Sequence, residues 1–155
     1  MDTRPATIAD TEELLRIATV MFASVGLDPT DRGWEQPARD RLREGFADGT
    51  VAAFVVNHPT DPGRCVAAAA VSLQTRLPTP PNPGGLAAYV QWVATDLDFR
   101  RGGLARALME SVIAWSSTQG VGSIDLHASA EGEALYRDLG FGPGHNPELR
   151  YFPHR

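Results

Sequence analysis

The sequence predicts a protein of mixed class, α/β or α+β, whose strands form one central sheet. Residues 9–26 carry apolar side chains three and four positions apart, which is the spacing of an amphipathic helix. Residues 50–56 and 64–75 are apolar runs separated by the turn-forming segment 57–63, which is typical of a β-hairpin. Helical and extended segments alternate to the end of the chain, and 155 residues suit one domain with one core.

The expected elements alternate along the chain, and two of them have unusual features. Asp10 is expected to cap the first helix, with Glu13 three residues later completing a capping box. The run from Ala67 to Ala70 is unusual for a strand, because alanine forms strands poorly. The elements are a strand at 3–8, helices at 9–26 and 34–49, strands at 50–56, 64–75 and 86–95, a helix from about 102 to 119, a strand at 121–128, a helix at 130–140 and a last strand at 148–152.

Composition and charge restrict the classes of function. The formal net charge is −5, which argues against a general affinity for nucleic acid. No apolar run approaches the ~20 residues of a membrane-spanning helix, and the first residues lack the basic and apolar regions of a signal peptide. The single cysteine, Cys65, excludes an internal disulfide and a cysteine-based metal site. We therefore expect a cytoplasmic protein with no metal, no membrane partner and no nucleic-acid partner.

The stretch DFRRGGLARALME, residues 98–110, has two adjacent glycines and three arginines at the start of a helix. The first amides of a helix have no partner within it and carry the positive end of its dipole. Glycine allows an anion to approach those amides, and Arg100, Arg101 and Arg106 add positive charge. The stretch therefore predicts a pyrophosphate site, and the alternative interpretation is a packed helix start beside surface arginines.

Two common phosphate motifs do not fit this stretch. A Walker A loop requires a lysine after its second glycine, and the stretch contains no lysine. A dinucleotide motif requires a third glycine and normally lies in the first strand–helix–strand unit, whereas this stretch comes two-thirds of the way along the chain. A nucleotide-binding switch is therefore disfavoured.

The segment Arg100-Arg101-Gly102-Gly103-Leu104-Ala105 resembles the signature Gln/Arg-x-x-Gly-x-Gly/Ala of the GCN5-related N-acetyltransferase (GNAT) superfamily. ALYRDLGF (134–141) is similar to that family's late helix and following strand, and RPATIADTEELLRI (4–17) looks like its usual opening. The order of the elements also agrees, so the resemblance covers nearly the whole chain. It implies a single GNAT-like domain over residues 1–155, with a mixed, mostly antiparallel sheet of about six to seven strands and helices on both faces.

The resemblance implies acetyl-coenzyme A (acetyl-CoA) as the cosubstrate. Its pyrophosphate would lie on backbone amides of the signature, and its pantetheine arm would lie between the splayed strands 86–95 and 121–128. Tyr136 would act as general acid to the leaving thiolate, because a phenol pKa of ~10 suits a thiolate of similar basicity. Ser129 stands where the family often has asparagine, and it reaches less far. The implied cofactor-binding residues are Val93, Thr95, Arg100, Arg101, Gly102, Gly103, Leu104, Ala105, Arg106 and Ser129.

The resemblance also implies direct attack by an amine of a small molecule or a peptide. Some family members have a glutamate base on the fourth strand, but here that position is Tyr89, and Gln91 on the same face is not a base. Both residues are expected on the acceptor side, with Trp92 on the opposite face. His127 is a candidate base, since its unperturbed pKa of ~6.5 suits proton removal near neutral pH. A structural role for His127 and a water-mediated base are the alternatives.

Other interpretations of the sequence stay open. A non-catalytic coenzyme A-binding or regulatory module on the same fold is the alternative function, motivated by the missing carboxylate and by Ser129. Residues 76–85, rich in proline and glycine, form either a lid over the acceptor site or a surface connection. A homodimer is compatible with these features, and the size of the acyl group is open. Acidic residues near the second helix, which either favour a cationic acceptor or are simply solvated, are Asp28, Asp31, Glu35, Asp40 and Glu44.

Overall fold

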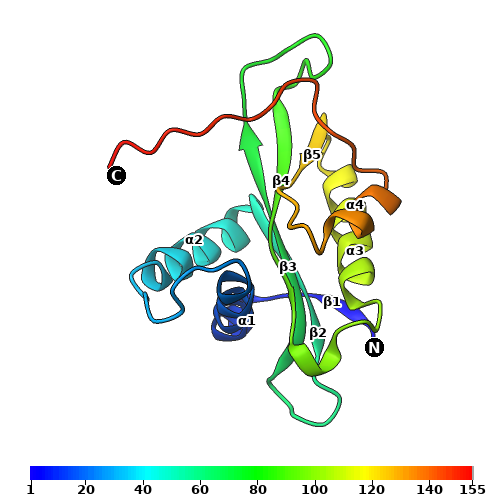
Figure 1. The fold of residues 1–155 in the computed structure, drawn as a ribbon. Coiled ribbons are helices and arrows are strands. Elements are labelled where there is room, and N and C mark those ends of the chain that lie inside the picture. The colour runs from blue at the N-terminus through cyan, green and yellow to red at the C-terminus, as the bar shows by residue number, and fades with distance from the viewer. Residues whose placement is uncertain (155) are drawn as a thin grey trace.

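The computed structural model describes residues 1–154. Within this range the centre is a five-stranded sheet with the order β1-β2-β3-β4-β5 (Figure 1). The first four strands pair antiparallel with their neighbours, and β5 pairs parallel with β4, so the predicted hairpin and the mostly antiparallel sheet are confirmed. The strands are β1 (Thr3–Pro5), β2 (Val51–Asn57), β3 (Cys65–Thr75), β4 (Leu86–Thr95) and β5 (Ser123–Asp125).

In the described part of the chain, four α-helices cover both faces of the sheet, as predicted (Figure 1). α1 and α2 pack on one face, and α3 packs on the other, where Tyr136 of α4 joins the same core. None of these helices is both long and apolar enough to span a bilayer. The helices are α1 (Thr11–Ser24), α2 (Glu35–Asp48), α3 (Leu104–Thr118) and α4 (Glu133–Asp138), with short 3-10 helices η1 (Ile8–Asp10) and η2 (Leu97–Phe99).

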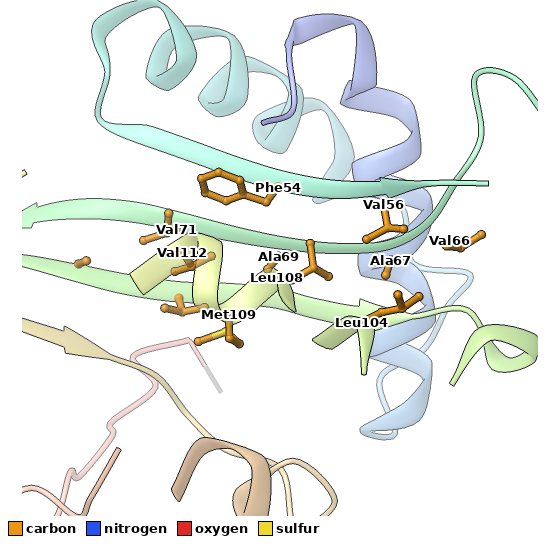
Figure 2. Close-up of a cluster of buried hydrophobic side chains, with 12 residues drawn as sticks. Phe54, Val56, Val66, Ala67, Ala69, Val71, Leu104, Leu108, Met109 and Val112 are labelled. Atoms are coloured by element: carbon orange, nitrogen blue, oxygen red, sulfur yellow. The ribbon is translucent and has the colours of Figure 1, made fainter. Parts of the chain in front are cut away.

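The core between the sheet and α3 is formed by alternate strand residues and one stripe of the helix. Phe54 of β2 and Leu108 of α3 belong to this core, shown in Figure 2, whereas the neighbouring Val55 faces α1 and α2. Leu108 is fully buried, which contributes about 1.5–3 kcal/mol relative to an exposed side chain. Both faces of β3 are buried as well. The strand prediction for 64–75 is therefore confirmed despite its alanines, because burial between two helix layers overrides the weak preference of Ala67 to Ala70.

β4 contains a bulge at Trp92 that changes which side chains share a face. The pairing with β3 shifts between Ala68 and Ala70, where β4 carries one extra residue, and Trp92 has a φ of 56°. Gln91 and Trp92 both line a cavity of about 300 Å3 beside α2, whereas Val93 packs toward α3. The expectation that Trp92 faces away from Gln91 is therefore wrong, because the extra residue reverses the alternation.

The prediction of a last strand at 148–152 is wrong, since the described residues after α4 form no strand. The expected strand at 121–128 is also shorter, because only Ser123–Asp125 pairs with β4. A strand at 148–152 would have to pair with the backbone N–H and C=O groups of β5. Because β5 is short, it offers too few of these groups. The chain after α4 instead runs outward as an extended segment, red in Figure 1. The sheet therefore has five strands in the described residues rather than six to seven.

Asp10 does not cap α1 through its side chain, which corrects the expected capping box. Its carboxylate binds Arg4 at 2.8 and 2.9 Å and accepts a hydrogen bond from the amide of Thr7 at 2.8 Å, closing η1. The hydrogen bond from Arg4 lowers the pKa of Asp10 below its ordinary value. Glu13 instead accepts a hydrogen bond from the amide of Cys65 at 2.8 Å and thereby joins α1 to β3.

Candidate active site

A cavity of about 850 Å3 lies where β4 and β5 part. The pairing of these strands ends at Tyr89 and Asp125, so they separate as the resemblance implies. Phe22 of α1 lines the cavity from one side of the sheet, and Leu104 of α3 and Tyr136 of α4 line it from the other. The cavity therefore runs through the gap between the strands, and its volume lies within the ~300–1,000 Å3 of small-molecule sites.

Nearly all of the residues predicted for the site line this one cavity. Gly102 is the exception, since it lies in the turn before α3 but outside the lining. The roles of the predicted site residues in binding and catalysis stay predictions. The predicted residues that line the cavity are Tyr89, Gln91, Val93, Thr95, Arg100, Arg101, Gly103, Leu104, Ala105, Arg106, His127, Ser129 and Tyr136.

The turn before α3 has left-handed backbone at two positions. Arg101 has a φ of 63°, and Gly103, the N-cap of α3, has a φ of 77°. A Cβ at Gly103 would meet no atom within 4 Å, so glycine is favoured there by its backbone conformation rather than by crowding. Such turns form concave anion-binding nests, and the free amides of the first helical turn follow directly. Gly102 is not left-handed, so the two glycines are not equivalent.

The three arginines near this turn have different partners. The Nε of Arg100 donates to the carbonyl of Thr95 at 3.2 Å, which fixes the loop to the end of β4. Arg106 pairs with Asp138 of α4 at 3.3 Å. Arg101 is exposed and has no ion-pair partner within residues 1–154. This end of the cavity is therefore positive, and Arg101 is the arginine with its charge free for an anion.

Tyr136 is a half-buried residue of α4 that lines the cavity. Its ring packs so closely over Gly132 that a Cβ there would lie 3.0 Å from a ring carbon. The ring also contacts Phe141 edge-on, with centroids 6.1 Å apart. Burial raises the pKa of its phenol, and its hydroxyl forms no hydrogen bond with another described residue. Tyr136 can therefore stay protonated at neutral pH and donate that proton into the cavity.

Ser129 holds the start of α4 in addition to lining the cavity. Its hydroxyl accepts a hydrogen bond from the amide of Gly132 at 3.1 Å. Because Tyr136 packs on Gly132, this bond helps to set the position of the tyrosine ring. The hydroxyl of Ser129, which the resemblance assigns to cofactor binding, therefore already has a hydrogen-bond partner within the protein.

Tyr89, His127 and Glu148 form a hydrogen-bonded chain beside the first half of β4, away from the turn that carries Arg100 and Arg101. The hydroxyl of Tyr89 contacts Nδ1 of His127, and Nε2 of His127 lies 2.7 Å from the carboxylate of Glu148. Arg150 binds the same carboxylate at 3.0 Å, and these hydrogen bonds, that of Arg150 first, lower the pKa of Glu148. No motif in the sequence links Glu148 to His127, because the two residues are 21 positions apart. The predicted strand at 148–152 also gave no reason to place Glu148 at this site.

The C-terminal half of α1 forms an apolar wall of the cavity that no sequence motif marks as part of a site. Met21 and Phe22 line the cavity together with Trp92. Phe22 contacts Trp34 edge-on at a centroid distance of 5.0 Å, and Trp34 contacts Trp92 at 5.8 Å. Helical spacing does mark Met21 and Phe22 as an apolar face, but it does not reveal whether that face meets the core or a cavity. The wall suits an apolar group on a ligand.

The acidic residues near α2 do not form a charged wall for the cavity. Asp28 and Asp31 accept backbone hydrogen bonds within their own turns. Glu35 and Asp40 each pair with a nearby arginine at 2.8 Å. None of these side chains, nor Glu44, lines the cavity, which favours the solvated interpretation. Within residues 1–154, histidine, cysteine and acidic side chains form no group of three that could hold a metal ion.

The loop 76–85 connects β3 to β4 and is anchored at the end of these strands that lies away from the turn before α3. Arg76 binds Asp125 at 2.8 Å, and the side chain of Asn82 donates to the carbonyl of Leu86 at 3.0 Å. No residue of this loop lines the cavity. The structure therefore favours a surface connection over a lid.

The chain is similar in sequence and fold to proteins of one known family. The sequence pattern of the Acetyltransferase (GNAT) family matches residues 13–141. The structure of a GCN5-related N-acetyltransferase from Ralstonia eutropha JMP134 is similar, with 26% identity, a TM-score of 0.83 and coverage of 97% of both chains. A predicted acetyltransferase with acetyl-CoA from Clostridium acetobutylicum has 20% identity, a TM-score of 0.84 and coverage of 96% of this chain and 95% of that chain.

A more distant similarity extends to an enzyme with a named substrate. Glucosamine-6-phosphate N-acetyltransferase from Arabidopsis thaliana is 18% identical, with a TM-score of 0.73 and coverage of 97% of both chains. At this identity the similarity concerns the fold alone. No curated protein sequence matches the chain.

Proposed function

The chain belongs to the GNAT acetyltransferase family, and we propose that it transfers the acetyl group of acetyl-CoA to an amine. One observation carries the proposal. A single cavity connects the N-terminus of α3 with Tyr136 through the gap between β4 and β5. A site that holds a pyrophosphate and delivers a proton to a thiolate needs these two parts in one space.

The turn before α3 fits the pyrophosphate of acetyl-CoA. Left-handed backbone at Arg101 and Gly103 precedes the unpaired amides of the first helical turn, and the charge of Arg101 is free. Anions bind helix N-termini of this kind through amides and the helix dipole. The Clostridium acetobutylicum protein of the same fold was solved with acetyl-CoA, which supports the same cosubstrate here.

Tyr136 is the general acid in this proposal. The amine nitrogen attacks the thioester carbonyl, a C–N bond forms, and the C–S bond breaks. Tyr136 gives its phenol proton to the departing sulfur and regains a proton that the nitrogen loses. Its half-buried ring, the raised pKa of its phenol and a hydroxyl with no hydrogen-bond partner among the described residues all suit this role. Such acid catalysis contributes about 100- to 10,000-fold.

The acceptor in this proposal is an amine of a small molecule or a peptide that carries an apolar group. Phe22 and Trp92 form an apolar wall on the α1 side of the cavity. Glu131 is the only carboxylate among the described lining residues, and it lies at the arginine end, 4.0 Å from Arg100. A second positive charge on the acceptor would therefore find no partner on the α1 side.

A non-catalytic coenzyme A-binding module is the second candidate function. Two observations favour it: position 89 carries a tyrosine rather than a carboxylate, and the hydroxyl of Ser129 already bonds to Gly132. This candidate predicts binding of coenzyme A without turnover of its thioester.

Thermal melting with acetyl-CoA, followed by a thiol-release assay with a panel of primary amines, tests both candidates. A ligand at about 100 times its Kd raises the free energy of unfolding by about 2.7 kcal/mol. We expect this shift with acetyl-CoA and not with ATP, and release of free thiol with at least one amine. No shift at millimolar acetyl-CoA rejects both candidates. A shift without thiol release from any amine favours the non-catalytic module.

A further inference from the structure

An acceptor amine must lose a proton before it attacks, and the cavity offers few groups that can take one. Glu131, the only lining carboxylate among the described residues, lies beside Arg100 at the opposite end from Tyr89. His127 is the only imidazole among those lining residues. A neutral imidazole with a free ring nitrogen is a common proton acceptor in enzymes. His127 is therefore the base that the cavity itself supplies.

Both ring nitrogens of His127 have partners, and these partners determine its tautomer. Nε2 lies 2.7 Å from Glu148, and the carboxylate can only accept a hydrogen bond, so Nε2 carries the hydrogen. Nδ1 then has a free lone pair and accepts the hydroxyl proton of Tyr89. Tyr89 in turn has its oxygen lone pairs available to a donor in the cavity, which it lines. The chain of hydrogen bonds thus has one direction, from the cavity to Glu148.

We propose that Tyr89, His127 and Glu148 form a proton relay that deprotonates the acceptor amine. The inference rests on the acetyl transfer proposed above. An ammonium N–H donates its proton to the Tyr89 oxygen while the phenol proton passes to Nδ1 of His127. The products are a neutral amine, an unchanged phenol and an imidazolium. Glu148 is the positioning residue, because its carboxylate holds the Nε2–H tautomer and stabilises the imidazolium.

Exposure increases along the relay, which gives the proton a way out. Tyr89 is half-buried, and burial raises the pKa of its phenol, so it stays protonated between transfers. The side chains of His127 and Glu148 are 49% and 60% exposed, so a proton on His127 exchanges with solvent. The other charged residues around these three groups are Asp125, Arg76 and Arg150.

The tautomer of His127 is the first test. Full-length protein with nitrogen-15 histidine is examined by long-range proton–nitrogen NMR, and His127→Gln identifies the signal. We expect the Nε2–H tautomer in the wild type and a mixture of tautomers in Glu148→Gln. Glu12→Gln is the matched control, because Glu12 is also an exposed carboxylate paired with an arginine, Arg39, but does not contact His127. An Nδ1–H tautomer in the wild type, or no change in Glu148→Gln, overturns the relay.

A matched pair of acceptors is the second test. Benzylamine and O-benzylhydroxylamine both carry a phenyl group that suits the wall of Phe22, but only benzylamine is protonated at pH 7. Tyr89→Phe should lower kcat/KM for benzylamine about 100- to 10,000-fold, which is the usual range for a lost general base. Glu148→Gln should lower it about 10- to 100-fold, as expected for one hydrogen bond to a charged group. Turnover of O-benzylhydroxylamine should change little in both variants, and Glu12→Gln should change neither.

The outcomes separate the relay from acetyl transfer itself. Equal losses for the two acceptors indicate a merely structural role for these side chains and overturn the relay, as does unchanged turnover of benzylamine. Acetyl transfer stands in both cases. If wild-type protein shows no melting shift with acetyl-CoA and releases no thiol with any amine, acetyl transfer fails, and the relay that rests on it fails too.

Discussion

The two ends of the cavity are built in different ways. The arginine end comes from one continuous stretch, residues 95–106, and depends on local backbone conformation and on the start of α3. The end proposed for the acceptor is assembled from separate parts of the chain. Phe22 of α1, Tyr89 of β4 and His127 line it, and Glu148 binds His127 from outside the lining. The two hydrogen bonds at this end span 38 and 21 residues.

The two ends of the cavity should therefore respond differently to substitution. A site made of backbone amides depends on few side chains, so most substitutions near it leave the amides in place. A site made of side chains from separate elements changes whenever one of those elements changes. We therefore expect substitutions at the two ends of the cavity to have separable effects on acetyl-CoA and on the amine.

The largest effect is expected at Tyr136, which lies between the two ends. Tyr136→Phe removes the proposed acid while keeping the ring that packs on Gly132 and Phe141. The kcat of thiol release should fall about 100- to 10,000-fold. The melting shift with acetyl-CoA should remain, because the turn before α3 is untouched. Unchanged kcat would remove Tyr136 from the mechanism.

Gly103→Val should break the arginine end alone. Valine is strained at a φ of 77°, and any local rearrangement moves the amides that we propose to bind the pyrophosphate. The variant should lose the stabilisation of about 2.7 kcal/mol that acetyl-CoA gives at 100 times its Kd. Differential scanning fluorimetry with and without acetyl-CoA measures this loss.

Gly49→Val is a matched control for this strain. Gly49 also has a φ of 77° and no atom within 4 Å of an added Cβ, but it ends α2 and does not line the cavity. Both variants should melt at a lower temperature than the wild type. The Gly49 variant should keep its response to acetyl-CoA, and a Gly103 variant that also keeps it would contradict the assignment of the pyrophosphate site.

Phe22→Ala should break the acceptor end alone, with a smaller effect. Losing apolar contact worth about 1–2 kcal/mol raises the KM for benzylamine roughly tenfold. The Kd for acetyl-CoA, measured by titration calorimetry, should stay unchanged. A weaker affinity for acetyl-CoA with an unchanged KM for the amine would show that the two ends are assigned the wrong way round.

The smallest effect is expected in the alkaline stability of the protein. Burial raises the phenol pKa of Tyr136 and of Tyr89, so each contributes stability that is present below the unfolded pKa of ~10 and is lost as pH rises through the folded pKa. The free energy of unfolding should therefore fall above about pH 10. Denaturant melts across this range should show a shallower fall in Tyr136→Phe. An equally steep fall in that variant would contradict the effect of burial.

Much of the fold could be predicted because its signals are local. All four α-helices lie within their predicted ranges, and β4 has the predicted bounds, Leu86–Thr95. The turn around Gly103 was also recognisable, since its motif and its conformation belong to the same few residues. Strand pairing between segments far apart in the sequence could not be predicted from the sequence. The sequence of 148–152 alternates like a strand, but β5 offers no matching edge, so no strand forms there in the described chain.

The order of elements through α4, the family and the residues of the arginine end could be read from the sequence, because helix periodicity, turn residues and a short motif are properties of contiguous chain. The residues that line the opposite end of the cavity could not be read from the sequence and became visible only in the folded chain. The bulge at Trp92 turns that side chain to the same side as Gln91, and the extended segment after α4 brings Glu148 to His127. These arrangements depend on how distant segments pack, and packing between segments leaves no periodic trace in the sequence.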